Sequence, residues 1–582
     1  MTKIADRLQI LRSVTANSLR PGSLAFALFS AAFVALSLCV LNVHYTINDD
    51  TAIIANVMGG YPIRYVGIVL TSLLHFAYVT APNIAWLGIV LYTLHVVSLY
   101  TWLSLVWKVF RPGWLATICT LAVLGYYVVF LVELDYTAVS VMLCMAGITW
   151  ACLLVVEGQP GYVPFLGSGV LFMLGMMVRP QGAPGALAYG LPLIVLTLLF
   201  CFQTWQGTVQ IRRLALIGLL FFIPAVFNFA ADGAWRHIIL SPQQANYDAF
   251  NSVRGDLHRL NRARKRAIMD NEMLLASVHW TRHDAEYFFD WKFLDERTYN
   301  VDALQTLLAG APTPQFTRAS LLPLVMRSVS LRNPLFLIIT ASLPLFLLLL
   351  VRRPLLGVCG VFVPVYSVCL TALMYFMFAF TFRVELPFVT GVGFGGLLLG
   401  GLLARPSMGT SDPAYSPAAL LAAIIALIGM GLSMGGILDN QQNLGMTAER
   451  VQEKLQVLNH DYAGSVLLVE PGVLHLDVLS PLDPIDLHFQ TIDLGWNTFS
   501  PRFYHAIGAL GVEHGYELMD SLVNRDHAYL MANPQWCKDM LAYINGYPQR
   551  DIQVQLVTPV YGHIGVYRLV EAAKLPAENP SR

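Results

Sequence analysis

Long runs without charged residues constrain this chain more than any other feature. Eleven of them approach or exceed the roughly 20 residues that a helix needs to cross the apolar part of a bilayer. They lie at residues 24–42, 84–107, 114–132, 138–156, 162–178, 183–205, 214–231, 334–351, 355–380, 386–404 and 417–438. Hydrophobic residues make up 56% of the chain and charged residues only 12%, a balance too apolar for a water-soluble protein of this size. We therefore expect a polytopic α-helical membrane protein.

A further apolar run, 63–80, decides the orientation. Arg64 opens it and His75 interrupts it, so it either crosses the membrane or lies at its surface. Short basic loops stay in the cytoplasm. If 63–80 does not cross, every such loop falls on the side of the basic N-terminus; these loops carry Lys108, Arg111, Arg212, Arg213, Arg352, Arg353 and Arg405. We therefore expect a juxtamembrane or re-entrant helix at 63–80, in a cell (plasma or inner) membrane protein whose N-terminus is cytoplasmic.

This orientation divides the chain into two predicted domains. Residues 1–438 form the transmembrane domain, with an outer loop at 43–83 and a long outer loop of mostly helical periodicity at 232–333. Residues 439–582 have the composition of a small soluble α/β domain, which we expect to be extracytoplasmic. Its β-like runs are 465–469, 552–558 and 565–570, and its helix-like runs include 515–524 and 534–545.

Charged residues gather on the predicted outer face. Asp49 and Asp50 follow the first span, either as a solvated helix end or as a general base that takes a proton from an attacking hydroxyl. Arg179, Arg383 and Arg64 lie near the same interface. Their guanidinium groups suit phosphate oxygens, although interfacial arginines also extend to lipid headgroups.

Other polar residues allow several interpretations. Glu133 and Asp135 could bind the hydroxyls of an acceptor or restrain the first outer loop, and Glu133 could also belong to a solvated turn. The outer aspartates could hold a divalent cation, but no third ligand is placed by the sequence, so we expect no metal and no cofactor. A formal net charge of +0 argues against a nucleic-acid partner, because binding to phosphates requires a basic surface.

Several short motifs follow one another along the chain: Asn48–Asp50, Gly59–Tyr61, Ala81–Trp86, Asp135–Ala138, Met177–Gly182, Tyr247–Arg254, Trp291–Phe293 and Arg383–Pro387. In their order and common sidedness they resemble the motifs of bacterial membrane glycosyltransferases of the GT-C superfamily. The resemblance covers about residues 24–400, with Pro180–Gln181 standing where that family would have an aromatic residue and an acid.

The resemblance implies a GT-C-like fold and a function at the outer leaflet. The donor would be a sugar on a polyprenyl phosphate, and the acceptor a glycan or lipid-linked glycan of the cell envelope. Asp49 or Asp50 would act as the base and Arg383, Arg179 and Arg64 would bind the donor phosphate. Direct displacement assisted by a base predicts inversion at the sugar carbon. The residues around the acceptor or behind the site would be Asp135, Glu133, Glu385, Asn251, Arg254 and Trp291.

Two other functions remain open. A transporter or flippase of lipid-linked saccharides would also have many spans, but it would place ionisable residues along a path through the membrane. Here the acids cluster at one face. An envelope scaffold or sensor would tolerate substitution of Asp49 and Asp50, whereas an enzyme would not.

Overall fold

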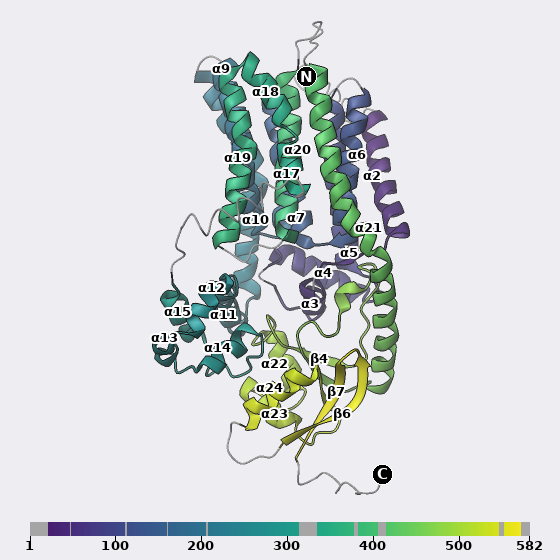
Figure 1. The fold of residues 1–582 in the computed structure, drawn as a ribbon, viewed down its shortest axis with the longest axis vertical. Coiled ribbons are helices and arrows are strands. Elements are labelled where there is room, and N and C mark those ends of the chain that lie inside the picture. Colours follow the sequence, from purple (N-terminus) through teal and green to yellow (C-terminus); the bar gives the residue numbers. More distant parts are fainter. Residues whose placement is uncertain are drawn as a thin grey trace, which may run out of the picture.

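The molecule is elongated and mainly helical in the computed structural model (Figure 1). A bundle of long helices forms one end, and short helices with a sheet form the other. The structure describes residues 21–46, 48–63, 65–110, 113–159, 161–204, 208–312, 334–377, 382–405, 415–545 and 552–571.

Nine spans in the described ranges are long and apolar enough to cross a bilayer. Two shorter apolar helices, α2 (Pro21–Val40) and α8 (Val163–Val178), correspond to the other predicted runs. The mainly helical class is confirmed, and the described helices are consistent with the predicted polytopic protein, while the count of eleven spans is not confirmed. The nine are α5 (Trp86–Val109), α6 (Gly113–Val132), α7 (Tyr136–Val156), α9 (Gly182–Thr204), α10 (Thr208–Ile239), α17 (Pro334–Thr340) continued by α18 (Leu343–Arg352), α19 (Pro354–Met377), α20 (Phe382–Ala404) and α21 (Tyr415–Asp461).

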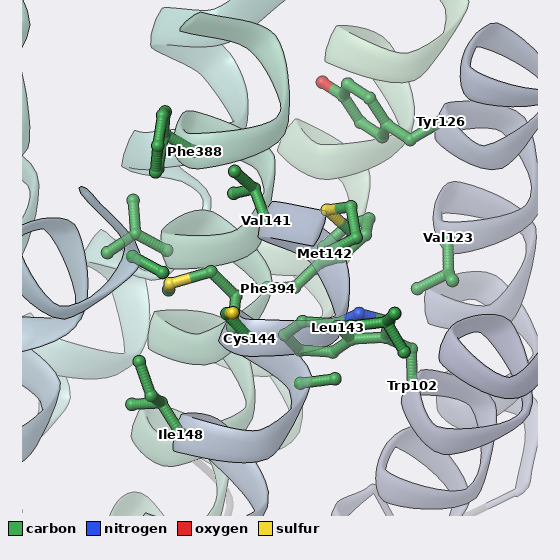
Figure 2. Close-up of a cluster of buried hydrophobic side chains, with 14 of the residues drawn as sticks. Trp102, Val123, Tyr126, Val141, Met142, Leu143, Cys144, Ile148, Phe388 and Phe394 are labelled. Carbon is green, nitrogen blue, oxygen red and sulfur yellow. The ribbon is translucent and has the colours of Figure 1, made fainter. Parts of the chain in front are cut away.

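The centre of the bundle is formed by α7 and α20. Their apolar segments are 83% and 94% buried, against 28% for α10 and 22% for α21. Aromatic rings fill the space around them: Phe394 of α20 lies with its ring centroid 5.5 Å from that of Trp102 and 5.7 Å from that of Tyr126 (Figure 2). All three side chains are buried, so the interior of the bundle is closely packed and apolar.

The outside of the bundle is also apolar. On α10, the side chains of Val226, Phe227 and Phe229 are 63%, 72% and 73% exposed. A water-soluble protein rarely exposes large apolar side chains together, whereas lipid is an ordinary environment for them. This outer surface supports the expectation that the bundle lies in a membrane.

Two short helices, α3 (Asn48–Met58) and α4 (Ile68–Thr80), lie across one end of the bundle (Figure 1). The 13 residues of α4 span about 20 Å, too little to cross the roughly 30 Å apolar core of a bilayer. Gly67 holds α4 against the end of α8, because its N–H donates to the carbonyl of Met177 at 2.9 Å. A Cβ at this position would lie 2.6 Å from that oxygen, so the contact requires glycine.

Five short helices form a cap beyond the bundle. Each begins at a Ser, Asn or Thr whose side chain accepts a hydrogen bond from the N–H three residues later, a frequent way to start a helix. The loop predicted at 232–333 is therefore helical over most of its described part, and α10 enters it as far as Ile239. The cap helices are α11 (Pro242–His258), α12 (Arg262–Met269), α13 (Glu272–Ser277), α14 (Arg282–Phe289) and α15 (Val301–Gly310).

A small α/β region follows α21, which continues out of the bundle as one 47-residue helix. The predicted domain boundary at 438 thus falls inside a continuous helix. The sheet has the order β4-β3-β5-β7-β6, with β3 parallel to β4 and β5, and β7 antiparallel to β5 and β6. Its strands are β3 (Val466–Val469), β4 (Gln490–Asp493), β5 (Ala528–Ala532), β6 (Ile552–Tyr561) and β7 (Ile564–Glu571), accompanied by α22 (Pro501–Gly508), α23 (Gly515–Leu522) and α24 (Pro534–Asn545).

The cap and the α/β region share one hydrophobic core. Phe250 and Phe293 of the cap meet Phe499 beside α22, with ring centroids 5.2 Å and 5.9 Å apart. The two parts are therefore packed as one body against the end of the bundle.

Candidate functional site

A cavity of about 1030 Å³ lies where the end of the bundle, the cap and the α/β region meet. Its walls come from α3, from the turns that begin α9 and α20, from α11, and from the loops after β3 and β4. The volume is at the upper end of the roughly 300–1,000 Å³ of small-molecule sites. Among the residues that the structure describes, five arginines line it: Arg179, Arg254, Arg259, Arg383 and Arg502.

The bundle supplies Arg179 and Arg383, which the sequence analysis assigned to phosphate binding. An Nη of Arg383 lies 3.8 Å from a carboxylate oxygen of Asp135, which is buried. The other carboxylate oxygen accepts the N–H of Thr137 at 2.5 Å, and this cap starts α7. Asp135 therefore stands behind the cavity wall and holds Arg383, while Arg383 itself lines the cavity.

Arg179 is positioned by the start of α7 as well. Its guanidinium donates to the hydroxyl of Thr137 and lies 4.9 Å from the ring centroid of Tyr136, which also lines the cavity. The backbone turns at once into α9, and Gly182 makes this possible because a Cβ there would lie 2.3 Å from the hydroxyl oxygen of Ser140. Arg179 and Arg383 thus reach one wall from segments about 200 residues apart in the sequence.

Asp50, at the start of α3, is not part of a solvated helix end. Asp50 is fully buried beneath the lining, while the next residue, Thr51, faces the cavity. Burial raises the pKa of the neighbouring Tyr45 well above its ordinary value, and the negative charge of Asp50 adds to the shift. Tyr45 is fixed by the parallel pairing of β1 (His44–Tyr45) with β2 (Glu133–Leu134), which joins the first outer loop to the turn before α7.

Two predicted residues, Asp49 and Arg64, are not fully described by the structure. The backbone of Asp49 belongs to α3, but its side chain lies outside the described part of the structure. Arg64 lies outside the described residues altogether.

The cap contributes Arg254 and Trp291. The guanidinium of Arg254 is buried, lies 4.6 Å from the ring centroid of Trp291 and donates to the side-chain oxygen of Asn251. His258 stacks on Trp291, and the two ring centroids are 3.8 Å apart. Burial lowers the pKa of His258 well below its ordinary value, and the positive charges of Arg254 and Lys265 lower it further. The imidazole is therefore neutral near pH 7.

Trp291 holds a strained backbone conformation, with φ at 64°. Such strain persists where the surroundings fix it, as the stacking on His258 does here. The result is a rigid aromatic face on the cavity wall.

The α/β region supplies a third wall that the sequence analysis missed. Glu470 follows β3 and Asp493 ends β4, so both lie at the carboxyl edge of parallel strands, where ligands of α/β sheets commonly bind. Asp493 accepts from Arg502 at 2.9 Å. Burial raises the pKa of Glu470, partly offset by hydrogen bonds from the backbone and side chain of Asn533. The strand β4, which places Asp493, gave no clear sequence signal, so this edge could not be predicted.

Two other predicted residues lie off the wall. Glu133 is half-buried in β2, where burial raises its pKa and the nearby Asp135 carboxylate adds to the shift. Glu385 is buried in α20 and accepts a hydrogen bond from the hydroxyl of Tyr375. Among the predicted residues, the structure thus brings Arg179, Arg383, Arg254 and Trp291 to one cavity, with Asp135 and Asn251 in contact with the arginines.

The arrangement suits an anionic ligand. Arg502 is paired with Asp493, and Arg383 with Asp135. In the described part of the lining, five arginines still face three carboxylates, Glu470, Asp486 and Asp493. In the described ranges, no group of three or more His, Cys, Asp or Glu side chains is placed to hold a metal ion.

Comparisons with protein-family models, with curated proteins and with solved structures find no match to this chain.

Proposed function

We propose that this protein is a membrane glycosyltransferase of the GT-C type. It moves a sugar from a polyprenyl-phosphate donor to a glycan of the cell envelope at the outer face of the membrane. The observation that carries the proposal is the convergence of Arg179 and Arg383 on a large cavity at the end of an apolar bundle.

The two arginines suit a lipid phosphate. A phosphate at the end of an isoprenoid chain sits at the membrane interface, and the bundle ends at Arg179 and Arg383. Guanidinium groups form paired, charge-assisted hydrogen bonds to phosphate oxygens. These bonds strengthen as negative charge develops on the leaving phosphate, which is the form of stabilisation that accelerates transfer.

An apolar groove provides a place for the isoprenoid chain. It has a volume of about 340 Å³, lies between α9 and α19, and includes Leu191, Val195, Val358 and Phe362. Those four side chains are 42% to 57% exposed at the outside of the bundle. Leu191 follows Gly182, at the start of α9, by nine residues, or roughly 14 Å of helix. A donor with its phosphate at Arg179 can therefore extend its chain into this groove.

The chemical step needs one base. The oxygen of an acceptor hydroxyl forms a bond to the anomeric carbon as the bond from that carbon to the phosphate oxygen breaks. The polyprenyl phosphate leaves with the electron pair, and a carboxylate takes the hydroxyl proton. Direct displacement inverts the configuration of the anomeric carbon.

Asp49 or Asp50 supplies this carboxylate in the proposal, as the resemblance implies. The burial of Asp50 beneath the lining favours Asp49 as the base and gives Asp50 the task of fixing α3.

The sidedness follows from the charges at the two ends of the bundle. Arg352, whose Nη donates to the carbonyl of Ala404, marks the end of α20 opposite to Arg383. Lys108 also lies at a helix end, paired with Glu157. The positive-inside rule favours the cytoplasm for these ends, which supports the proposal that the cavity and the α/β region lie outside.

The transporter alternative finds less support. A path through the membrane requires polar groups or a cavity along the bundle, whereas Trp102, Tyr126 and Phe394 pack together at its centre (Figure 2).

The test uses purified protein in lipid nanodiscs with a panel of synthetic short-chain polyprenyl-phosphate sugars. Mass spectrometry follows the formation of polyprenyl phosphate and of the glycosylated product, with Arg383→Ala as the impaired variant. The proposal expects one donor of the panel to be consumed by the wild-type protein. Donor that crosses a liposome bilayer without any sugar being transferred would support the flippase instead.

A further inference from the structure

A second cavity adjoins the first. It has a volume of about 490 Å³ and lies between the segment before α4, the start of α11 and the start of α22. Two side chains, Tyr61 and His505, line both cavities. Their ring centroids are 6.4 Å apart, so two flat rings stand side by side where the cavities meet.

The second cavity differs from the first in charge. Its described lining includes no Asp, Glu, Lys or Arg, whereas five arginines line the first. An anionic ligand is therefore favoured in the first cavity, while the second suits a neutral one. The lining is also too polar for an isoprenoid chain, since it carries Ser241, Gln243, Gln244 and the phenol of Tyr504.

Gln244 gives an independent indication of a ligand. Its side chain is 3% exposed and its amide nitrogen donates to Asp248 at 3.0 Å. This fixes the orientation of the amide, and its oxygen, Oε1, has no hydrogen-bond partner in the described part of the chain. A buried amide oxygen is destabilising unless it accepts a hydrogen bond. A ligand with O–H groups supplies that donor.

Tyr504 complements Gln244. Burial raises the pKa of Tyr504 to about 12, and the charge of Glu296 adds to the shift, so the phenol keeps its proton. The cavity therefore offers an O–H donor, an unfilled acceptor and flat faces at Tyr61 and His505. Hydroxyl groups alternating with apolar faces are the chemistry of a sugar.

We propose that the second cavity binds the inner sugar units of a neutral, extended glycan acceptor whose terminal unit occupies the first cavity. The chain lies across Tyr61 and His505, which line both cavities. This inference rests on the proposed function, because it assigns the class of acceptor to the same site. It predicts that the protein prefers a chain of several sugars to a single sugar.

The test measures binding of purified, fluorescently labelled full-length protein to arrayed ladders of linear glucan, mannan, galactan and arabinan oligosaccharides of one to six units. We expect the dissociation constant in at least one ladder to fall at least tenfold between one unit and four. Gln243→Trp, which fills the second cavity, and Gln244→Leu, which removes the acceptor oxygen, should abolish this gain and leave binding of the single unit unchanged. Gln305→Trp, an exposed position on α15, is the matched control.

Three results would overturn the inference: affinity independent of chain length, a gain that survives both cavity variants, or no binding to any ladder. The result is separable from that of the transfer assay. Length-dependent binding without sugar transfer would support the glycan site and contradict the proposed enzyme activity. Transfer to single sugar units as fast as to long chains would contradict only the inference about the second cavity.

Discussion

The interior of the bundle and the walls of the cavity at its end are built in different ways. In the interior, neighbouring helices contribute rings such as Trp102 and Tyr126, which are held by close packing without charged groups. At the cavity, charged side chains from segments far apart in sequence meet, and specific contacts such as Arg383 with Asp135 fix each one. The first arrangement gives stability and the second gives a site, so changes in the two regions should have separable effects.

The largest expected effect concerns the base. Asp49→Asn should lower kcat for sugar transfer by about 100- to 10,000-fold, the usual contribution of a positioned base, while the melting temperature stays close to that of the wild type. Asp50→Asn should instead lower the melting temperature, because it changes a carboxyl group that is fully buried. Steady-state kinetics and thermal unfolding in the same detergent measure both. Full activity of Asp49→Asn together with lost activity of a well-folded Asp50→Asn would reverse the assignment.

A change in the bundle interior should affect stability alone. Trp102→Ala removes a buried ring from its contacts with Phe394, and such truncations lower the free energy of unfolding by about 3–5 kcal/mol. Lipid replaces water around this bundle, so we expect a value near the lower limit. Trp114→Ala, at a position that is 47% exposed, is the control and should have little effect. Equal melting temperatures for the two variants would show that packing in the interior does not determine the stability of the bundle.

The phosphate contact should give the next largest effect. Arg383→Ala removes a charge-assisted contact of about 1.5–3 kcal/mol, which corresponds to a roughly 10- to 100-fold fall in kcat/KM for the donor. Arg383→Lys should recover part of the loss because it keeps the charge. Arg352→Ala, at the opposite end of the bundle, should leave kcat/KM unchanged. An unchanged kcat/KM for Arg383→Ala would separate this arginine from the donor.

The groove between α9 and α19 predicts a smaller change. Val195→Trp should fill the groove and raise KM for a long-chain donor by about three- to tenfold. A change of this size corresponds to the loss of one or two buried methylene groups of the donor. A donor with a ten-carbon chain should not be affected. Val226→Trp on the exposed face of α10 serves as the control. If the two donors respond alike, the isoprenoid chain lies elsewhere.

The smallest expected effect is a pH dependence of stability in the cap. Burial alone would raise the pKa of Asp295, but hydrogen bonds from Arg297 and Thr298 outweigh it and hold the pKa below its ordinary value of 3.8. A carboxyl group with a lowered pKa stabilises the folded state above that ordinary value. The contribution disappears as the pH falls through the lower, folded value.

Melting temperatures of Asp295→Asn and the wild type should therefore differ at pH 7 and converge below pH 3.8. Asp526→Asn, which alters an exposed pair with Arg568, is the control and should change the melting temperature little at pH 7. A constant difference at all pH values would mean that Asp295 acts by packing rather than by charge.

The sequence predicted the interior of the molecule better than the cavity. The predicted run at 138–156 corresponds to α7 (Tyr136–Val156), and the predicted runs at 465–469 and 534–545 correspond to β3 and α24. Such elements can be predicted because local periodicity determines them. The short strands β4 and β5 were missed, since four or five residues between loops carry little periodic signal.

Tertiary contacts account for the rest. The burial of Asp50 depends on Tyr45 and on the pairing of β1 with β2, which no local pattern reveals. The third wall of the cavity depends on a parallel sheet that brings Glu470 and Asp493 to one edge. Arg179 and Arg383 could be predicted as interfacial from the ends of their spans, but not that they line the same cavity.

The most direct measurement is a cryo-electron microscopy structure of the protein in nanodiscs with a non-transferable polyprenyl-phosphonate sugar. We expect the phosphonate within hydrogen-bond distance of Arg383 and Arg179, the sugar in the cavity beside α3, and the isoprenoid chain in the groove between α9 and α19. Density for the phosphonate away from both arginines, or part of the way through the bundle beside Trp102, would contradict the proposed function.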